Sequence, residues 1–209
     1  MTVKQEEYEI TLRRAFEEHY EEASDVWSND LAMRAFPSVV QGLLKLPFRT
    51  RVLDVGCGNG DDLEYFAKVF SNVVGVDLVE HENWSALSGG YRNISFHGSS
   101  FLSLENLGEF DLILDNGCFH HQHPDDYMSY LEKIKISLDR LGWLVMSTFK
   151  SNVQTELIDS KGRLHRYFSD SELEDLLGRA GFSMHQSIDL FRVGPGDYYR
   201  LSFLNLSKN

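Results

Sequence analysis

Apolar and polar positions follow two rhythms along the chain, one helical and one typical of buried strands. In residues 6–22, Tyr8, Leu12 and Phe16 share one helical face, with acidic residues opposite. A second helix is predicted over residues 31–45, where Pro37 either kinks it or divides it in two. Short apolar runs predict strands at 51–55, 72–77, 93–98, 110–115, 142–149, 182–190 and 198–206. Helices are predicted at 61–70, 82–88, 125–138 and 169–180.

Strands and helices alternate from residue 51 to residue 181. Short apolar strands in that order predict an α/β fold, with a mostly parallel sheet covered by helices on both faces. The last two strands are joined only by a tight turn around Pro195, so they should be antiparallel. We expect an N-terminal helical cap over residues 1–48 and a main domain over 49–209. Ligands should bind beyond the carboxyl ends of the parallel strands.

The charge, the cysteine count and the lengths of the apolar runs limit what the protein is expected to bind. The 209 residues include 20 basic and 32 acidic side chains, a net charge of −12, which disfavours non-specific binding to nucleic acid or anionic lipid. Cys57 and Cys118 are too few for a disulfide framework or a Cys-rich zinc site. No apolar run approaches the ~20 residues of a membrane helix, and the N-terminus does not look like a signal peptide. A cytoplasmic monomer or homodimer is therefore expected.

A glycine-rich turn follows the first predicted strand. Gly56, Gly58 and Gly60 allow the backbone to approach a ligand closely and to turn into a helix. Asp77 ends the next strand, where a carboxylate can accept hydrogen bonds from ribose hydroxyls. The third glycine comes one residue too early for the dinucleotide pattern Gly-x-Gly-x-x-Gly, so a hydride-transferring dehydrogenase is the weakest interpretation.

The acids near this turn indicate the charge of the ligand. Asp61 and Asp62 at the start of the helix would repel a phosphate but tolerate a cation, and Asp54 adds a third acid inside the strand. The expected nucleotide therefore has a ribose, no phosphate and a cationic part. S-adenosylmethionine (SAM), which carries a sulfonium and an ammonium group, fits these requirements.

Residues 52–60, 74–77 and 110–115 resemble the successive motifs of class I SAM-dependent methyltransferases. The resemblance runs from about residue 50 to the C-terminus. It implies a seven-stranded sheet whose last strand is antiparallel, with SAM as the cofactor. The residues that it places around SAM are Asp54, Gly56, Cys57, Gly58, Gly60, Asp77, Leu78, Ser99, Ser100, Phe101, Asp115 and Asn116.

The same resemblance assigns roles to several of these residues. Asp54 would help to bind the ammonium group, Asp77 would hold the ribose hydroxyls, and Leu78 would lie against adenine. Family members often carry an aspartate where this chain has Ser99, whose hydroxyl can still accept a hydrogen bond from the adenine amino group. Phe101 and backbone groups would then contribute to adenine binding. The backbone around residues 115 and 116 would reach the methionine amine.

A histidine-rich stretch follows the fourth predicted strand. Residues 115–124 lack the Asn-Pro-Pro-aromatic motif of nucleic-acid amino-methyltransferases and resemble an Asp-x-Gly-x-x-His-His pattern of small-molecule methyltransferases. His120 or His121 would face the acceptor and take its proton, although methyl transfer does not always need a base. Helix capping and packing are the alternative roles, and His123 is expected to cap the next helix. The spacing does not predict a metal site.

Two other segments are candidates for a lid. Residues 150–168, which include Arg166 and Tyr167, lie beyond the fifth strand and either cover the pocket or form a plain surface loop. In the first two predicted helices and the link between them, Tyr20 and Trp27 either fold over the site or pack in the core. An aromatic face near the sulfonium would gain cation–π attraction.

The predicted function is direct, in-line methyl transfer from SAM to an oxygen, nitrogen or sulfur atom of a small molecule, with release of S-adenosylhomocysteine. One alternative is an intramolecular cyclase or lyase that consumes SAM and releases methylthioadenosine. Another is a non-catalytic SAM-binding partner subunit.

Overall fold

The computed structural model describes residues 3–22, 30–44, 46, 49–153, 155–191 and 198–207. Within these ranges no helix has the length and apolar character needed to cross a bilayer. The helices are α1 (Val3–Glu21), α2 (Leu31–Leu43), α3 (Asp61–Ala67), α4 (Asn83–Gly90), α5 (Tyr127–Ser137) and α6 (Asp170–Ala180), with 3-10 turns η1 (Phe119–His121) and η2 (Pro124–Asp126). The strands are β1 (Arg51–Val55), β2 (Asn72–Asp77), β3 (Ile94–Gly98), β4 (Phe110–Asn116), β5 (Leu138–Lys150), β6 (Glu156–Ile158), β7 (Leu164–Phe168), β8 (Phe182–Phe191) and β9 (Tyr198–Leu206).

The main sheet has the strand order β3-β2-β1-β4-β5-β9-β8. The pairs from β3 to β5 are parallel, whereas β9 is antiparallel to both β5 and β8. The prediction of a parallel sheet with one reversed strand near its edge is therefore confirmed. Pro37 lies inside α2, which remains a single helix.

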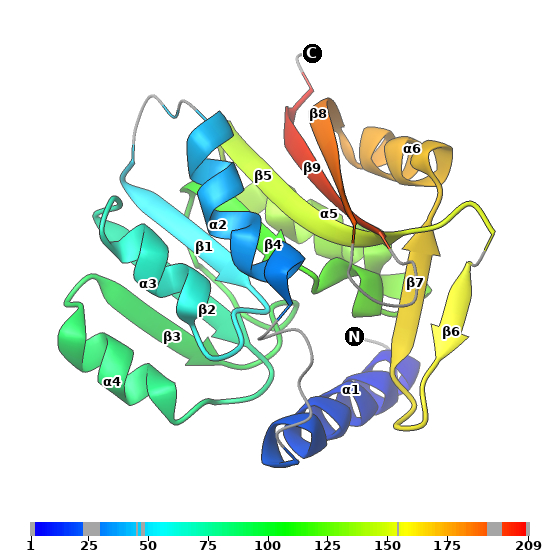
Figure 1. Cartoon of the computed structure of the whole chain (residues 1–209), viewed down its shortest axis with the longest axis horizontal. Helices are drawn as coiled ribbons and strands as arrows, with labels where there is room; N and C mark the ends of the chain where they lie inside the picture. Colours follow the sequence, from blue (N-terminus) through cyan, green and yellow to red (C-terminus); the bar gives the residue numbers. More distant parts are fainter. Residues whose placement is uncertain are drawn as a thin grey trace.

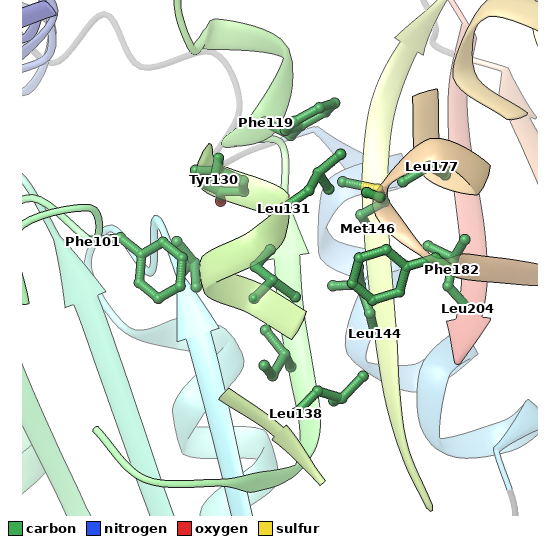
Figure 2. Packing of buried hydrophobic residues seen from close by; sticks show 14 of the residues in the cluster. Phe101, Phe119, Tyr130, Leu131, Leu138, Leu144, Met146, Leu177, Phe182 and Leu204 are labelled. Atoms are coloured by element: carbon green, nitrogen blue, oxygen red, sulfur yellow. The ribbon is translucent and has the colours of Figure 1, made fainter. Parts of the chain in front are cut away.

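Alternate side chains of the central strands enter different cores. In β4, Leu112 and Leu114 face the core shared with α2, α3 and α4, whereas Ile113 faces the core shared with α5 and α6. These two groups of helices cover opposite faces of the sheet (Figure 1). In the second core, aromatic and aliphatic side chains from α5, α6, β5, β8 and β9 pack together, with Phe119 of η1 at one end (Figure 2).

Strand β5 continues past the end of β4. Its last pair with β4 joins Ser147 to Asn116, and beyond this point Phe149 and Lys150 pair in parallel with β7. Strand β7 also forms an antiparallel hairpin with β6. The segment predicted either to cover the pocket or to be a plain loop is thus largely a hairpin, and it stands at the carboxyl edge of the sheet.

Helix α1 lies across this same edge (Figure 1). The Arg13 guanidinium donates a hydrogen bond to the Leu78 carbonyl beyond β2. At the opposite side Lys161, in the β6–β7 turn, forms ion pairs with Glu18 at 3.1 Å and Glu22 at 3.0 Å. These contacts connect α1 to the tip of β2 and to the hairpin, so α1 covers the carboxyl edge of the sheet.

Candidate active site

A cavity of about 360 Å³ lies under α1 at the carboxyl edge of the sheet. Its lining combines the turn after β1, the ends of β2 and β4, the start of the β3–β4 connection, η1, and the β6–β7 hairpin. The volume is within the usual range for a small-molecule site. The position agrees with the rule that open α/β sheets bind ligands beyond the carboxyl ends of their strands.

The glycine turn is held in a fixed shape by backbone hydrogen bonds. The amides of Gly56 and Cys57 both donate to the Val76 carbonyl, at 2.8 and 3.1 Å. Gly56 has φ 77°, and a Cβ on it would lie 2.7 Å from the Cβ of Cys118, so only glycine fits. The Gly58 amide donates to Asp77 Oδ2 at 2.8 Å, which ties the turn to the end of β2.

Four carboxyl groups of the lining surround this turn: Asp54, Asp61, Asp62 and Asp77. Asp54 is buried, and its Oδ1 has no hydrogen-bond partner among the described residues. Burial raises the pKa of Asp54 well above its ordinary value, with a further contribution from Asp62. Burial also raises the pKa of Asp62 to about 7. Such a site favours a cationic ligand, because a nearby positive charge stabilises the ionised carboxylates.

The groups predicted for the adenosine half also line the cavity: Leu78, Ser99, Ser100 and Phe101. The Ser99 hydroxyl has no partner within the described part of the chain, so it is available to a ligand. Asp77 accepts a second backbone bond, from Val79 at 2.9 Å, and keeps lone pairs for further hydrogen bonds. The residues present therefore fit SAM: an unpartnered acid for its cationic end, a close backbone turn, and an oriented carboxylate for its ribose.

Two predicted cofactor residues lie outside the cavity lining, Gly60 and Asp115. Gly60 has φ 91°, and a Cβ on it would meet Leu87 at 2.7 Å, so it turns the chain into α3. Asp115 is fully buried; its Oδ1 accepts from the amides of Cys118 and Phe119, and its Oδ2 accepts from the Tyr130 hydroxyl at 2.6 Å. Gly60 and the Asp115 side chain thus shape the turns beside the cavity, and backbone contact with SAM at these two positions stays a prediction.

The remaining predicted residue after β4, Asn116, lines the cavity. Its Nδ2 donates to Asp62 Oδ2 at 2.9 Å and to the Met33 carbonyl of α2 at 3.3 Å. Asn116 therefore connects Asp62, at the start of α3, to helix α2. Cys57 and Cys118 also line the cavity, and burial raises the pKa of both thiols well above the ordinary value, so neither is activated as a thiolate.

The turn shaped by Asp115 places the two predicted catalytic histidines at the cavity. His120 and His121 are both buried, line the cavity, and have ring centroids 4.4 Å apart. His121 Nδ1 lies 2.6 Å from the Leu164 carbonyl. Because a carbonyl only accepts, Nδ1 carries the proton and Nε2 is the basic nitrogen. Burial lowers the pKa of His121 well below its ordinary value, so the ring is neutral at pH 7.

Tyr8 of α1 connects the His121 backbone to the start of β7. Its hydroxyl donates to the His121 carbonyl at 2.7 Å and accepts from the Leu164 amide at 3.1 Å. Burial raises the pKa of Tyr8 to about 12, so the hydroxyl stays protonated. His123 lies outside the cavity lining, and its Nδ1 accepts from the Asp125 amide at the start of η2, so the predicted capping role is confirmed.

The lid residues predicted from sequence divide into three groups. Tyr20 lines the cavity, and its hydroxyl lies 3.5 Å from where a Cβ on Gly58 would stand. Tyr167 also lines the cavity, stacked on Phe149 with 5.1 Å between ring centroids. Arg166 lies outside the lining and pairs with Glu172 at 3.0 Å, which corrects its assignment to the lid. Trp27 lies outside the described residues.

Several residues of the acceptor side were not predicted from sequence. They are Tyr8, Phe16, Phe149, Arg163, His165 and Tyr199, all of which line the cavity. Phe149 carried a usable signal, because it is an aromatic residue at the end of a strand whose carboxyl end faces the site. Arg163 and His165 lie within the segment predicted as a candidate lid, but nothing in the sequence singled them out, because their placement depends on the hairpin.

Comparisons with known proteins agree with this geometry. The family model described as a methyltransferase domain matches residues 16–187. The 1,6-didemethyltoxoflavin-N1-methyltransferase of Burkholderia thailandensis, solved with 1,6-didemethyltoxoflavin and S-adenosylhomocysteine bound, shares 33% identity and a TM-score of 0.92, covering 100% of this chain and 92% of that one. A complex of DhpI with S-adenosylhomocysteine shares the fold, with 17% identity, a TM-score of 0.69, and 100% of each chain covered.

Among curated proteins, an uncharacterised methyltransferase of Schizosaccharomyces pombe is 34% identical over 83 residues. The match covers 38% of this chain and 57% of the yeast protein. This chain thus spans little more than half the length of that relative.

Proposed function

Because the chain belongs to the methyltransferase-domain family and has the fold of class I SAM-dependent methyltransferases, we propose that it transfers a methyl group from SAM to a ring nitrogen of a small, flat heteroaromatic molecule. The observation that carries this proposal is one shared cavity, in which the acid-rich cofactor turn faces two histidines and an aromatic wall. The similar Burkholderia enzyme, by its name, methylates a nitrogen, N1.

The chain's own residues divide between the two substrates. Asp54 and Asp62 bind the cationic end of SAM, whose sulfonium supplies a methyl group open to attack by a nucleophile. Asp77 holds the ribose hydroxyls, and Ser99 accepts from the adenine amino group. Each of these groups lines the cavity, and Asp54 and Ser99 have buried oxygens that lack a partner within the described chain.

The acceptor binds against the aromatic wall formed by Phe149, Tyr167 and Tyr199. Stacking on such rings favours a planar acceptor over an aliphatic one. His121 Nε2 accepts the hydrogen bond of the ring N–H and takes its proton as the N–C bond forms. The C–S bond breaks, its electron pair stays on sulfur, and S-adenosylhomocysteine is released. The Leu164 carbonyl keeps His121 in the required tautomer, and Tyr8 holds the His121 backbone in place.

The test is to incubate the purified protein with SAM and 1,6-didemethyltoxoflavin and to analyse the products by mass spectrometry. We expect equal amounts of methylated acceptor and S-adenosylhomocysteine. A His121→Asn variant should bind SAM normally but turn over slowly. Methylthioadenosine formed from SAM without an acceptor would instead support the cyclase or lyase alternative. SAM bound and left intact with every planar N–H acceptor tried would support a non-catalytic subunit.

A further inference from the structure

The hairpin side of the acceptor pocket differs in charge from the cofactor side of the cavity. The lining residues contributed by the β6–β7 hairpin are Leu157, Arg163, His165 and Tyr167, none of which is acidic. The carboxyl groups of the lining come instead from β1, the end of β2, and α1, α3 and η2. A ligand that spans the cavity therefore meets four aspartates at its cofactor end and the Arg163 guanidinium at the hairpin. Glu9 of α1, Asp126 of η2 and Arg34 of α2 complete the charged lining.

Arg163 is held in one orientation. Its side chain is only 7% exposed, and its Nε donates to Asp159 Oδ2 at 3.1 Å. Asp159 is fixed by the backbone amides of Lys161 and Arg163, at 3.0 and 2.9 Å, and these hydrogen bonds help to lower its pKa to about 2. The guanidinium also lies over the ring of Phe16, 4.9 Å from its centroid. These contacts prevent Arg163 from turning out to solvent.

The carboxylate of Asp159 orients a second cavity group. His165 Nε2 lies 3.2 Å from Asp159 Oδ2, and the His165 ring is stacked on Phe149 with 5.8 Å between centroids. Asp159 itself does not line the cavity, so its role is to orient the Arg163 and His165 side chains that do. The hairpin thus presents a planar guanidinium and an imidazole beside the aromatic wall.

We propose that the acceptor is a heteroaromatic cyclic amide or imide, and that Arg163 binds the ring oxygen conjugated with the nitrogen that is methylated. The planar fork of a guanidinium matches an oxo group lying in the plane of a ring. This inference rests on the N-methylation proposed above, and it names the chemical class of the acceptor and the residue that selects it.

The contact between Arg163 and the ring oxygen also explains how the N–H proton leaves the acceptor. His121 is a weak base, since burial opposes its protonation. Removing the proton from an amide-type N–H places the negative charge partly on the conjugated oxygen. Arg163 stabilises that oxygen, so the proton passes to His121 Nε2 while the charge is carried toward the hairpin. As the proton leaves, the nitrogen attacks the methyl carbon and the C–S bond breaks, so the charge that builds up on the ring oxygen is lost again in the neutral methylated product.

The test compares two fused rings that differ in their oxo groups, purine-2,6-dione and purine. Binding of each to the full chain, saturated with S-adenosylhomocysteine, is measured by calorimetry. We expect the dione to bind at least tenfold more tightly than purine, and Arg163→Gln to abolish this preference. Arg163→Lys, which keeps the charge but not the fork, should retain a smaller preference. Arg166→Gln is the matched control, because it removes the same charge from β7 outside the cavity.

Affinity for S-adenosylhomocysteine and the melting temperature show whether each variant is folded. Equal binding of the two rings by the wild type, a dione that does not bind, or an undiminished preference in folded Arg163→Gln would overturn the inference. If Arg163→Gln does not fold, an undiminished preference in Arg163→Lys overturns it equally. Dione preference without any methyl transfer would refute the proposed N-methylation alone. N-methylation of acceptors irrespective of oxo groups would refute the role of Arg163 alone.

Discussion

The substitution Asp62→Asn should make the ligand-free protein more stable and its cofactor binding weaker. Asp62 is half-buried and faces the cavity, where burial raises its pKa from 3.8 to about 7. The amide is isosteric, and its oxygen can still accept the hydrogen bond from Asn116 Nδ2. The change therefore removes an unfavourable buried charge while keeping the local geometry.

The size of the effect follows from the pKa. A shift of one unit is worth about 1.4 kcal/mol, so a rise from 3.8 to about 7 sets an upper bound of roughly 4 kcal/mol. Solvent in the cavity screens part of this, which leaves about 1–2 kcal/mol. The folded protein binds more protons than the unfolded chain between pH 3.8 and about 7. This group therefore lowers the free energy of unfolding as pH rises through that window.

The assay is thermal unfolding of the ligand-free protein at several pH values, followed by calorimetry with SAM. At pH 8 the Asp62→Asn variant should melt roughly 2–8 °C above the wild type, and the difference should shrink toward pH 5. Its affinity for SAM should fall by about tenfold or more, because a charge-assisted hydrogen bond is lost. Asp175→Asn, at an exposed position of α6 outside the cavity lining, is the control. An unchanged melting temperature together with normal SAM affinity would refute the reasoning.

Three further predictions follow from the site. Asp77→Ala should weaken SAM binding at least tenfold by calorimetry, because it removes the ribose acceptor and releases the Gly58 amide; unchanged affinity would contradict this placement. His121→Asn should lower kcat while leaving SAM affinity within about twofold. In the wild type, the acid limb of the kcat/KM profile should lie below pH 6.5, because burial lowers the His121 pKa. An acid limb at or above pH 6.5 would contradict the role of His121 as the base. Tyr130→Phe should lower the free energy of unfolding by about 1–3 kcal/mol in urea, because Asp115 Oδ2 loses its hydroxyl partner; no loss would show that this bond contributes nothing.

The cofactor half of the site could be predicted from sequence because its groups lie next to recognisable strands. Gly56 and Gly58 follow a five-residue apolar strand, and Asp77 ends the next strand. In a parallel sheet these strand ends meet at one edge, so spacing along the chain is enough to bring the groups together. Gly60 and Asp115 lie outside the cavity lining for local reasons. Leu87 packs against Gly60, and the Asp115 carboxylate accepts hydrogen bonds within its own turn.

The acceptor half could not be predicted because it depends on long-range pairing. Strand β7 exists where β5 runs beyond β4, and nothing in the polar sequence of residues 150–168 specifies that vacant edge. Arg163 reaches the cavity only through this pairing and through Asp159. The apolar pattern places Tyr8 on the buried face of a helix, but its hydrogen bonds to His121 and Leu164 depend on where α1 lies in the fold.

The most direct test of the account is to follow the methyl group itself. The protein is incubated with SAM carrying a carbon-13 methyl group and with 1,6-didemethyltoxoflavin, and the products are examined by NMR and mass spectrometry. We expect the label to move to a ring nitrogen as S-adenosylhomocysteine accumulates in equal amount. Label retained in methylthioadenosine, or transferred to an oxygen or carbon of the acceptor, would contradict it.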